Sequence, residues 1–502
     1  MHLYELLENI SELKNQEEYK SVNILGVTCD SRLVKKDYMF IAIAGVNIDG
    51  KEYIPNAILS GAKVIITDAE DLKILQNNYP DNIFIKSQNI RLDYSLLAAK
   101  FYSGQPKNIV AVTGTNGKTS VVNFYAQIIA LLGQKSCSIG TIGIIGGDNK
   151  NLLADNFGLT TPNAEQLHQT FAKLVAKNID YLAMEASSHG LSQYRLHGVK
   201  INAAAFTNLS RDHIDYHKDE ADYFAAKMKL FNEVLPRNKV SIINADSEYA
   251  NEVIKICKKR EQKIFTFGIK GSDIKILGTK QTIDKQQIDF LYNNIEYKIS
   301  TDLIGSFQAS NLLCALSLVI NSNIDSSKAI NILSQVQGVP GRMEKVICKN
   351  NKNLNVVVDY AHTPDGLLKA LSELKNLKEN KLWVIFGCGG NRDKGKRILM
   401  GEIAAKLADK IIVTDDNPRN EDASEIRKQV IAGCKDAIEI ADREKAIAYA
   451  IENAENKDII LLAGKGHEKY QIIGEQKIPF DDVDIALKEL KKYSRSSNDF
   501  PL

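Results

Sequence analysis

A short glycine-rich segment constrains this chain more than any other feature of its sequence. Apolar residues at 109–112 predict a buried strand, residues 120–132 have the apolar spacing of a helix, and Gly114-Thr115-Asn116-Gly117-Lys118-Thr119 joins them. Glycines let backbone N–H groups approach phosphate oxygens, and the N-terminus of a helix adds partial positive charge. The lysine supplies a full charge, and the threonine hydroxyl can bind magnesium. The segment therefore predicts a site for a nucleotide phosphate.

The spacing within this loop departs from the usual phosphate-loop pattern, which has a glycine six residues before the lysine. Val112 occupies that position, and Gly114 lies only four residues before Lys118. The loop is thus a shortened variant. A plain glycine-rich turn is the alternative, but the strand before it and the helix after it favour nucleotide binding.

Composition excludes several classes of protein. The 502 residues predict about three domains. Because 64 basic and 62 acidic side chains leave a net charge of only +2, we expect no nucleic-acid partner, and any anion must bind at a local site. The seven cysteines form no Cys-x-x-Cys pair, which is typical of a reducing cytosol. We also expect no secretory signal and no membrane insertion, and therefore a cytoplasmic enzyme.

Two turn-rich joints, at residues 103–106 and 337–341, divide the sequence into three parts. Residues 1–105 predict a small mixed α/β domain, with strands near 39–43 and 64–66. Residues 106–337 predict a central α/β ATPase domain that carries the phosphate loop. Residues 338–502 predict a Rossmann-like α/β domain with strands at 356–358, 382–386, 410–413 and 459–462. The expected fold class is therefore α/β throughout.

Polar clusters follow the central strands predicted at 181–184 and 203–206, where parallel sheets place their ligand sites. Glu185 follows the first strand and could hold magnesium beside a phosphate loop, or it could be a solvated loop acid. The segment 208–217 contains two histidines but fits no standard zinc spacing, and a surface loop is the alternative. By its pattern alone, Lys227 is a solvent-exposed lysine on a helix.

Four more polar segments follow strands of the third part, at residues 359–364, 389–397, 415–419 and 464–468. Gly389-Gly390 precedes four cations within six residues, which suggests an anion site or, alternatively, an exposed basic turn. Asp416-Asn417-Pro418-Arg419 could be a simple turn, because Asp, Asn and Pro all favour turns. Four such segments at successive strand ends indicate a binding site.

Together these motifs closely resemble the Mur ligase family, the ATP-dependent amino-acid ligases of peptidoglycan assembly. The resemblance extends from Asp30-Ser31-Arg32 to Gly464-Lys465-Gly466-His467-Glu468, and it is strongest to the members that add the third stem-peptide residue. It implies ATP and two magnesium ions as cofactors. It also implies UDP-N-acetylmuramoyl-L-alanyl-D-glutamate and meso-diaminopimelate as substrates, and a monomer.

The resemblance also implies roles for individual residues. Catalytic roles fall to Lys118, Lys227 and His213. Nucleotide contacts fall to Gly114, Thr115, Asn116, Gly117, Lys118, Thr119, Ser120, Asn311, Arg342 and Asp359. Metal ligands are Thr119, Glu185, His213 and Lys227, the last as a carbamate. The uridine pocket includes Cys29, Ser31, Val46 and Asn47, and the muramoyl-dipeptide contacts are Thr160, Thr161, Ser187, Gln193 and Arg195. The amino-acid pocket consists of Arg392, Asp416, Asn417, Pro418, Arg419, Gly464 and Glu468.

Arg419 selects among the amino acids that the resemblance allows. Diaminopimelate carries one carboxylate more than lysine, and a guanidinium pairs with such a group through two charge-assisted hydrogen bonds. Lysine would leave Arg419 buried and unpaired, at a cost of roughly 2–5 kcal/mol, or about 30- to 5,000-fold in selectivity. The alternatives are the same ligase using L-lysine, a ligase similar to folylpolyglutamate synthase, and a nucleotide-binding switch. Because ligand residues lie on separate domains, we expect the third domain to close on the second after ATP binds.

Overall fold

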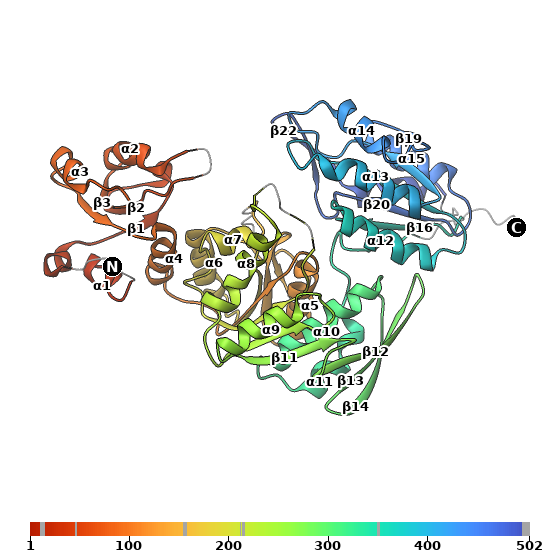
Figure 1. Ribbon diagram of the computed structural model, residues 1–502, viewed down its shortest axis with the longest axis horizontal. Helices are drawn as coiled ribbons and strands as arrows, with labels where there is room; N and C mark the ends of the chain where they lie inside the picture. Colours follow the sequence, from red (N-terminus) through yellow and green to blue (C-terminus); the bar gives the residue numbers. More distant parts are fainter. Residues whose placement is uncertain are drawn as a thin grey trace, which may run out of the picture.

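The computed structural model of this chain describes residues 1–10, 16–45, 48–153, 158–210, 212, 216–348 and 352–493. Three sheets follow one another along the chain, each with helices against it (Figure 1). The predicted α/β class with three α/β domains is confirmed. The domain limits at residues 105 and 337 stay proposals, and they fall in the connections between sheets. We call the parts built on the four-, ten- and six-stranded sheets the N-terminal, central and C-terminal lobes.

The N-terminal lobe has a four-stranded parallel sheet in the order β1-β2-β3-β4. Met39 and Ile41 point into one core, whereas Phe40 and Ala42 point into another. This alternation buries both faces of the sheet. The elements are α1 (Leu3–Leu7), β1 (Gly26–Thr28), β2 (Tyr38–Ile41), α2 (Ile54–Leu59), β3 (Ala62–Thr67), α3 (Leu72–Asn78), β4 (Ile83–Lys86) and α4 (Ile90–Phe101).

The central lobe has a ten-stranded sheet in the order β14-β13-β12-β11-β10-β9-β5-β8-β6-β7. The strands from β6 to β12 in this order run parallel, and β7, β13 and β14 are antiparallel to their neighbours. Its strands are β5 (Asn108–Thr113), β6 (Ser136–Gly140), β7 (Gly143–Gly146), β8 (Tyr181–Glu185), β9 (Ile201–Phe206), β10 (Val240–Asn244), β11 (Lys263–Gly268), β12 (Ile274–Gln281), β13 (Gln286–Tyr292) and β14 (Ile295–Thr301).

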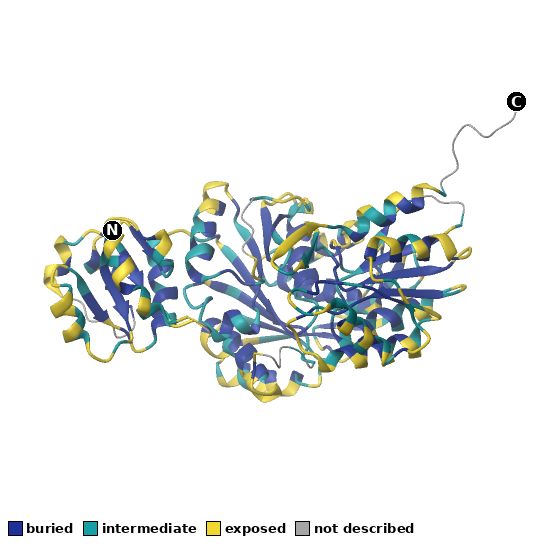
Figure 2. Cartoon of the chain, turned by 90° about the horizontal axis from the view of Figure 1, so that it is seen from above, coloured by how far each residue is buried: buried dark blue, intermediate teal, exposed yellow. Residues whose placement is uncertain are grey.

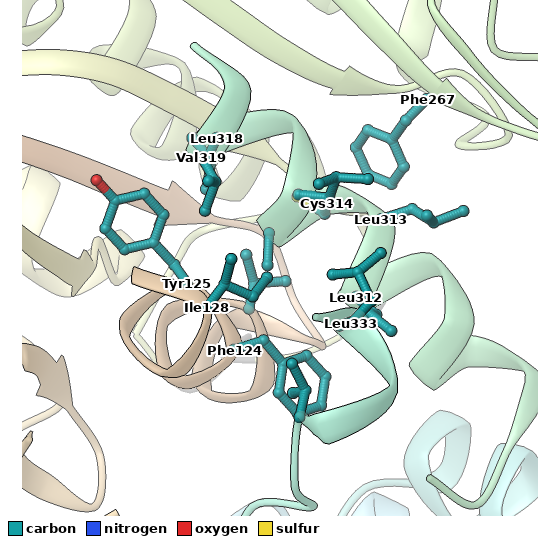
Figure 3. Close-up of a cluster of buried hydrophobic side chains, with 14 of the residues drawn as sticks. Phe124, Tyr125, Ile128, Phe267, Leu312, Leu313, Cys314, Leu318, Val319 and Leu333 are labelled. Atoms are coloured by element: carbon teal, nitrogen blue, oxygen red, sulfur yellow. The ribbon is translucent and has the colours of Figure 1, made fainter. Parts of the chain in front are cut away.

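Helices bury both faces of this sheet. Val110 and Val112 belong to one core and Ile109 and Ala111 to the other, as alternation along β5 requires. In the first core, aromatic side chains of α5 face apolar side chains of α10 (Figure 3). The helices are α5 (Lys118–Leu131), α6 (Ala164–Ala176), α7 (Ser188–Ser192), α8 (Glu220–Lys229), α9 (Ala250–Lys259), α10 (Ser306–Ile320) and α11 (Ser326–Asn331).

The C-terminal lobe has a six-stranded sheet in the order β15-β16-β20-β17-β18-β19, parallel except for β15. The middle strands of this sheet are buried, whereas the outer helix faces are exposed (Figure 2). The strands are β15 (Glu344–Val346), β16 (Asn355–Asp359), β17 (Leu382–Phe386), β18 (Lys410–Val413), β19 (Ile438–Glu439), β20 (Ile459–Ala463), and a separate hairpin of β21 (Tyr470–Ile473) and β22 (Gln476–Pro479). The helices are α12 (Pro364–Leu377), α13 (Gly395–Leu407), α14 (Ala423–Ile431), α15 (Arg443–Asn453) and α16 (Asp482–Lys491).

Outside the catalytic loops, Ile304 and Phe307 of the central lobe pack in the core of the C-terminal lobe, and two further attachments join the lobes. At the first, the connecting residue Gln337 donates its N–H to Gln127 Oε1 (2.8 Å), and Gln127 Nε2 donates to the Gln337 carbonyl (3.1 Å). The second is the tip of the β12–β13 hairpin. There, Ile283 packs against the core of the C-terminal lobe, and Asp284 forms an ion pair with Lys345.

Candidate active site

The phosphate loop lies between β5 and the N-terminus of α5, as predicted. Gly117 has a φ of 87°, and a Cβ at this position would collide with Asn311 Oδ1. Gly114 has a φ of 145°, and a Cβ there would collide with Thr207 Oγ1. Only glycine meets both the backbone and the packing requirement at these two positions. The loop can therefore follow its tight path between β5 and the end of β9.

Lys118 lies inside the curve of this loop. Its Nζ donates to the carbonyl oxygens of Gly114 (2.9 Å) and Thr115 (2.8 Å). Burial lowers the pKa of Lys118, and the carboxylates of Glu185 and Asp212 oppose that shift. The site thus holds a lysine nitrogen next to the backbone that would surround a phosphate.

Lys227 is buried, so the pattern-based prediction of a solvent-exposed lysine is wrong. Its side chain is 1% exposed, and its Nζ donates to the Gly114 carbonyl at 2.8 Å. Burial, reinforced by the nearby Lys118 charge, holds the pKa of Lys227 well below its usual value. The helix pattern could not reveal this, because β9, β5 and α8 meet at Lys227 only in the folded chain.

Glu185 ends β8 and is 1% exposed, so it is not the solvated loop acid that the sequence left open. Its Oε1 accepts the Thr141 N–H (2.8 Å), and its Oε2 accepts the Thr141 hydroxyl (3.3 Å). A Cβ at Gly140 would collide with this carboxylate. Glu185 is therefore held in one position beside the phosphate loop.

The proposed metal ligands fit magnesium only in part. The Thr119 hydroxyl and the Glu185 carboxylate are the hard oxygen ligands that magnesium prefers, and a carbamate on Lys227 would add another. His213 lies outside the described residues. Within the part of the chain that the structure describes, no three His, Cys, Asp or Glu side chains gather closely enough to hold a metal by themselves.

Two of the three further nucleotide residues come from the C-terminal lobe. Arg342 Nη2 donates to Thr119 Oγ1 (3.1 Å), and its guanidinium lies 4.4 Å from the centre of the Tyr360 ring. Burial raises the pKa of Asp359 to about 6, although the nearby Arg342 charge opposes this. Asn311 comes from α10 and touches the loop at Gly117. The structure thus brings Arg342 and Asn311 to the loop, and Asp359 lies near Arg342.

A cleft of about 1390 Å³ lies between the central and C-terminal lobes. Ten of the predicted substrate residues line it: Thr160, Thr161, Ser187, Arg195, Arg392, Asp416, Asn417, Arg419, Gly464 and Glu468. Gln193 lies just behind this wall, where its Oε1 accepts from Arg195 Nη2 (2.7 Å), and Pro418 belongs to the lining turn. The residues predicted for the muramoyl-dipeptide and for the amino acid therefore face one shared space.

Two arginines on the C-terminal wall are available to an anion. Arg419 has a φ of 52°, and its Nη1 donates to the Gly390 carbonyl at 2.9 Å. Its backbone pairs with the β21–β22 hairpin, through Arg419 N–H to the Ile472 carbonyl (3.1 Å) and Gly474 N–H to the Arg419 carbonyl (2.8 Å). Neither Arg419 nor the exposed Arg392 has an acidic partner among the described residues.

Opposite charges also meet on this wall. Asn417 Nδ2 donates to Glu468 Oε2 (2.9 Å), and the buried Lys465 lies 3.5 Å from Glu468 and 3.8 Å from Asp416. Burial raises the pKa of Glu468, whereas the hydrogen bond from Asn417 opposes the shift. Two carboxylates beside one lysine leave a net negative charge, which suits an ammonium group.

The basic segment after Gly389-Gly390 is an anion site only in part. Arg397 is fully buried and pairs with Glu421 (3.0 Å), and Lys396 donates to the His362 carbonyl (2.8 Å). These two cations hold the segment in place. Only Arg392, of the four cations in the segment, faces the cleft without a described polar partner.

The predicted uridine residues lie in the N-terminal lobe, away from this cleft. Cys29 follows β1, and burial raises the pKa of its thiol. Ser31 begins a short 3₁₀ turn over Ser31–Leu33. Val46 and Asn47 lie outside the described residues, so the structure brings together only part of this predicted pocket.

Several side chains at the site escaped the sequence analysis. Asp365 contacts the phosphate loop from the C-terminal lobe, Lys465 lies under the amino-acid pocket, and Thr141 holds Glu185. Lys465 lies within the recognised segment 464–468, whereas Asp365 and Thr141 carried no signal of their own. Their roles depend on contacts between distant segments, which a single sequence does not reveal.

Known proteins share this architecture over almost the whole chain. Sequence models match for the Mur ligase family catalytic domain at residues 23–102, the Mur ligase middle domain at 112–319, and the Mur ligase glutamate ligase domain at 341–466. A UDP-N-acetylmuramoyl-L-alanyl-D-glutamate--2,6-diaminopimelate ligase of Rickettsia conorii is 46% identical, over 94% of this chain and 97% of that protein. The ligase of the same name from Zymomonas mobilis is 43% identical over 93% and 95%.

Solved structures agree with these matches. A structure of a UDP-N-acetylmuramoyl-L-alanyl-D-glutamate--2,6-diaminopimelate ligase aligns with a TM-score of 0.70 at 30% identity, over 98% of this chain and 99% of that one. A folylpolyglutamate synthase of Mycobacterium tuberculosis complexed with ADP shares the fold alone, with a TM-score of 0.62 at 16% identity over 81% and 94%. This chain belongs to the Mur ligase family. No helix in its described part is both long and apolar enough to cross a membrane.

Proposed function

We propose that this chain is the ATP-dependent ligase that joins meso-2,6-diaminopimelate to the D-glutamate γ-carboxylate of UDP-N-acetylmuramoyl-L-alanyl-D-glutamate. The observation that carries the proposal is Arg419, an arginine without a described acidic partner, in the cleft wall that faces Thr160 and Arg195. Relatives that bear this name are similar over nearly their entire length. Two arginines and an acidic cluster in one wall match an amino acid with two carboxylates and two ammonium groups.

The proposed reaction has two steps. The γ-carboxylate attacks the ATP γ-phosphate, which gives an acyl phosphate and ADP, and the amine of diaminopimelate then displaces phosphate to form the amide. The first step brings one anion to another, so charge neutralisation and positioning are the main requirements. Lys118 supplies positive charge within the loop, and Arg342 supplies it from the opposite lobe.

We propose that Thr119, Glu185, His213 and a carbamate on Lys227 hold two magnesium ions, which would lower the charge of the phosphates when bound. A neutral amine is the form that adds carbon dioxide, and the depressed pKa of Lys227 favours that form. Carbamylation would convert the amine that now donates to Gly114 into an anionic oxygen ligand. Thr119, Glu185 and the carbamate would then supply oxygen ligands for the metal.

Replacement of Lys227 tests the carbamate. We expect Lys227→Ala to lose nearly all ligase activity, and bicarbonate should not restore it, because no amine remains to carry the group. Lys229→Ala, two residues along the same helix and half-exposed, is the matched control. Unchanged turnover of Lys227→Ala in steady-state assays would rule out this role.

Arg419 favours diaminopimelate over L-lysine, which is the nearest alternative. A ligase similar to folylpolyglutamate synthase is a weaker alternative, since that likeness shows the fold alone. A nucleotide-binding switch would hydrolyse ATP without an acceptor. We propose that Cys29, Ser31, Val46 and Asn47 bind the uridine nucleotide. The cytoplasmic location and the monomeric state stay predictions.

One assay separates these alternatives. ADP release is measured with the UDP-muramoyl-dipeptide and, in turn, with diaminopimelate, lysine or ornithine. We expect release to require both the dipeptide and diaminopimelate, and lysine to support it about 30- to 5,000-fold less well. Release without an acceptor would favour the switch, and equal release with lysine would contradict the proposed selectivity.

A further inference from the structure

Asp365 connects the C-terminal lobe to the phosphate loop through a single oxygen atom. Its Oδ2 accepts from Asn116 Nδ2 of the loop (2.8 Å) and from the Ser210 hydroxyl after β9 (3.0 Å). Within its own helix, the same oxygen pairs with Lys369 Nζ (2.8 Å). Two of these three partners belong to the central lobe, so this carboxylate bridges the cleft.

The two central-lobe partners belong to one hydrogen-bonded unit. The Asn116 N–H donates to Asn208 Oδ1 (3.0 Å), and its carbonyl accepts from Thr207 Oγ1 (2.6 Å). Ser210 N–H donates to Thr115 Oγ1 (3.0 Å). The phosphate loop and residues 207–210 are thus linked by their own bonds, and Asp365 contacts both segments.

Asp365 also lies in the first turn of α12, where a negative charge stabilises the helix terminus. That local effect requires neither Asn116 nor Ser210. Arg342 makes another contact between the C-terminal lobe and the loop, through Thr119, and it already belongs to the predicted nucleotide site. Asp365 has no such assignment.

We infer that Asp365 is a positioning residue, which sets the phosphate loop when the C-terminal lobe docks on it. Asp365 lines the cleft, and it acts on the loop through its bonds to Asn116 and Ser210. Docking then orders the loop and residues 207–210 together. The inference concerns ATP use and rests on the proposed function only for its activity readout.

Removal of the carboxylate should change both nucleotide affinity and turnover. A hydrogen bond to a charged group shifts an equilibrium by roughly 10- to 100-fold. We expect Asp365→Ala to weaken binding of a non-hydrolysable ATP analogue at least about fivefold by calorimetry, and to lower kcat about 10- to 100-fold. KM for the UDP-muramoyl-dipeptide should stay within about twofold, because the described partners of Asp365 include none of the predicted dipeptide contacts.

A matched set of variants separates positioning from helix stability. Lys369→Met removes only the ion pair within α12 and should change kcat by about twofold or less. Asp365→Asn keeps an oxygen acceptor and should retain more activity than Asp365→Ala. If the alanine variant fails to fold, the asparagine variant takes its place in the comparison with the unaltered chain. In an Asn116→Ala/Ser210→Ala background, Asp365→Ala should have little additional effect, because its two central-lobe donors are gone.

Two outcomes would overturn the inference. One is an Asp365→Ala variant whose analogue affinity and kcat equal those of the unaltered chain. The other is an undiminished effect of Asp365→Ala after both donors are removed, which would indicate helix stability alone. If the unaltered chain binds the ATP analogue but does not ligate diaminopimelate, the proposed function fails while the affinity comparison still decides the role of Asp365.

Discussion

Individual side chains at this site are defined by their neighbours rather than by their type. Lys118 and Lys227 both contact the Gly114 carbonyl, yet one lies in the loop and the other on α8. Burial lowers the pKa of both, and each is affected by the other's charge or by nearby carboxylates. Two lysines in one small volume favour neutral forms or anionic partners, which is consistent with phosphate at the first and a carbamate at the second.

Arg419 provides the first prediction at this scale. Arg419→Ala should raise KM for diaminopimelate and lower kcat/KM about 30- to 5,000-fold, because the distal carboxylate loses its guanidinium partner. Lysine, which lacks that carboxylate, should be affected far less, so the ratio of kcat/KM for the two amino acids is the measurement. Lys394→Ala changes an exposed cation of the neighbouring segment and is the control. An unchanged ratio would assign selectivity elsewhere.

His168 provides a prediction about pH. It is fully buried on α6, neither ring nitrogen has a partner among the described residues, and burial lowers its pKa to about 4. The unfolded chain therefore takes up this proton first. The free energy of unfolding therefore falls as the pH drops from about 6.5 to 4, by on the order of 3 kcal/mol. Above about pH 6.5 this loss is absent, because His168 is neutral in both states.

Comparison with His168→Leu separates the effect of His168 on stability from the effects of the other titrating groups. In urea unfolding at several pH values, the difference in free energy between the two proteins should move in favour of the variant as the pH falls from 6.5 to 4. A difference that does not vary with pH would contradict the prediction.

At the scale of elements, ligand-binding turns are held by structure behind them. The turn that contains Arg419 pairs with the β21–β22 hairpin, and Gln471 Nε2 donates to the Asp416 carbonyl (2.6 Å). Behind β20, Arg443 of α15 pairs with Asp482 of α16 through two bonds of 2.8 and 2.7 Å. Arg443 also donates to the carbonyl of Ala463, next to Gly464 (3.0 Å).

The Arg443–Asp482 pair is fully buried, which makes its disruption asymmetric. Arg443→Met should lower the free energy of unfolding by about 3–5 kcal/mol, because it leaves a carboxylate buried without a partner. The double variant Arg443→Met/Asp482→Leu should recover much of that loss, because no unpaired charge remains. Thermal and urea unfolding of all three proteins are the measurements. A double variant no more stable than the single one would contradict this account.

Sequence patterns predicted the elements whose apolar runs are continuous. The strands near 356–358, 382–386, 410–413 and 459–462 are confirmed because buried parallel strands are almost wholly apolar. The antiparallel extension β12–β14 and the β21–β22 hairpin were missed, since their strands are half-exposed and rich in Lys, Gln and Glu. The pairing of these strands depends on cross-strand contacts, which the strand propensities of single residues do not predict.

Side-chain environments were less predictable than strands. In the sequence, Arg397 is one of four cations that could form an exposed basic turn. In the structure it is buried and pairs with Glu421, which lies 24 residues away in sequence. Lys227 looked solvent-exposed, and only the resemblance to a family pointed to its role. Asp365 carried no signal, because its partners come from two segments of another lobe.

At the scale of the whole molecule, the residues predicted to bind ligands are distributed over three lobes. Nucleotide residues lie on both sides of the cleft, since Thr119 belongs to α5 while Arg342 and Asp359 belong to the C-terminal lobe. A ligand that contacts both lobes stabilises the arrangement in which both contacts form. Substrate binding should therefore draw the lobes together.

Small-angle scattering tests this closure. We expect a smaller radius of gyration with an ATP analogue, the UDP-muramoyl-dipeptide and diaminopimelate together than with the dipeptide alone, because only the complete set contacts all three lobes. The unliganded chain provides the baseline. Identical scattering in all conditions would show that the lobes do not move.

The contacts between these lobes outside the catalytic loops, among them those at Gln337 and at the β12–β13 tip, have a geometric consequence for such movement. A rigid body joined to another at several points cannot slide without breaking all of those contacts, whereas a rotation about them disturbs fewer. The C-terminal lobe would then turn about these contacts. Arg342, Asp365 and Arg419, carried on the same body, would travel together, so a shift at any of the contacts would change the distances of all three from the central lobe at once.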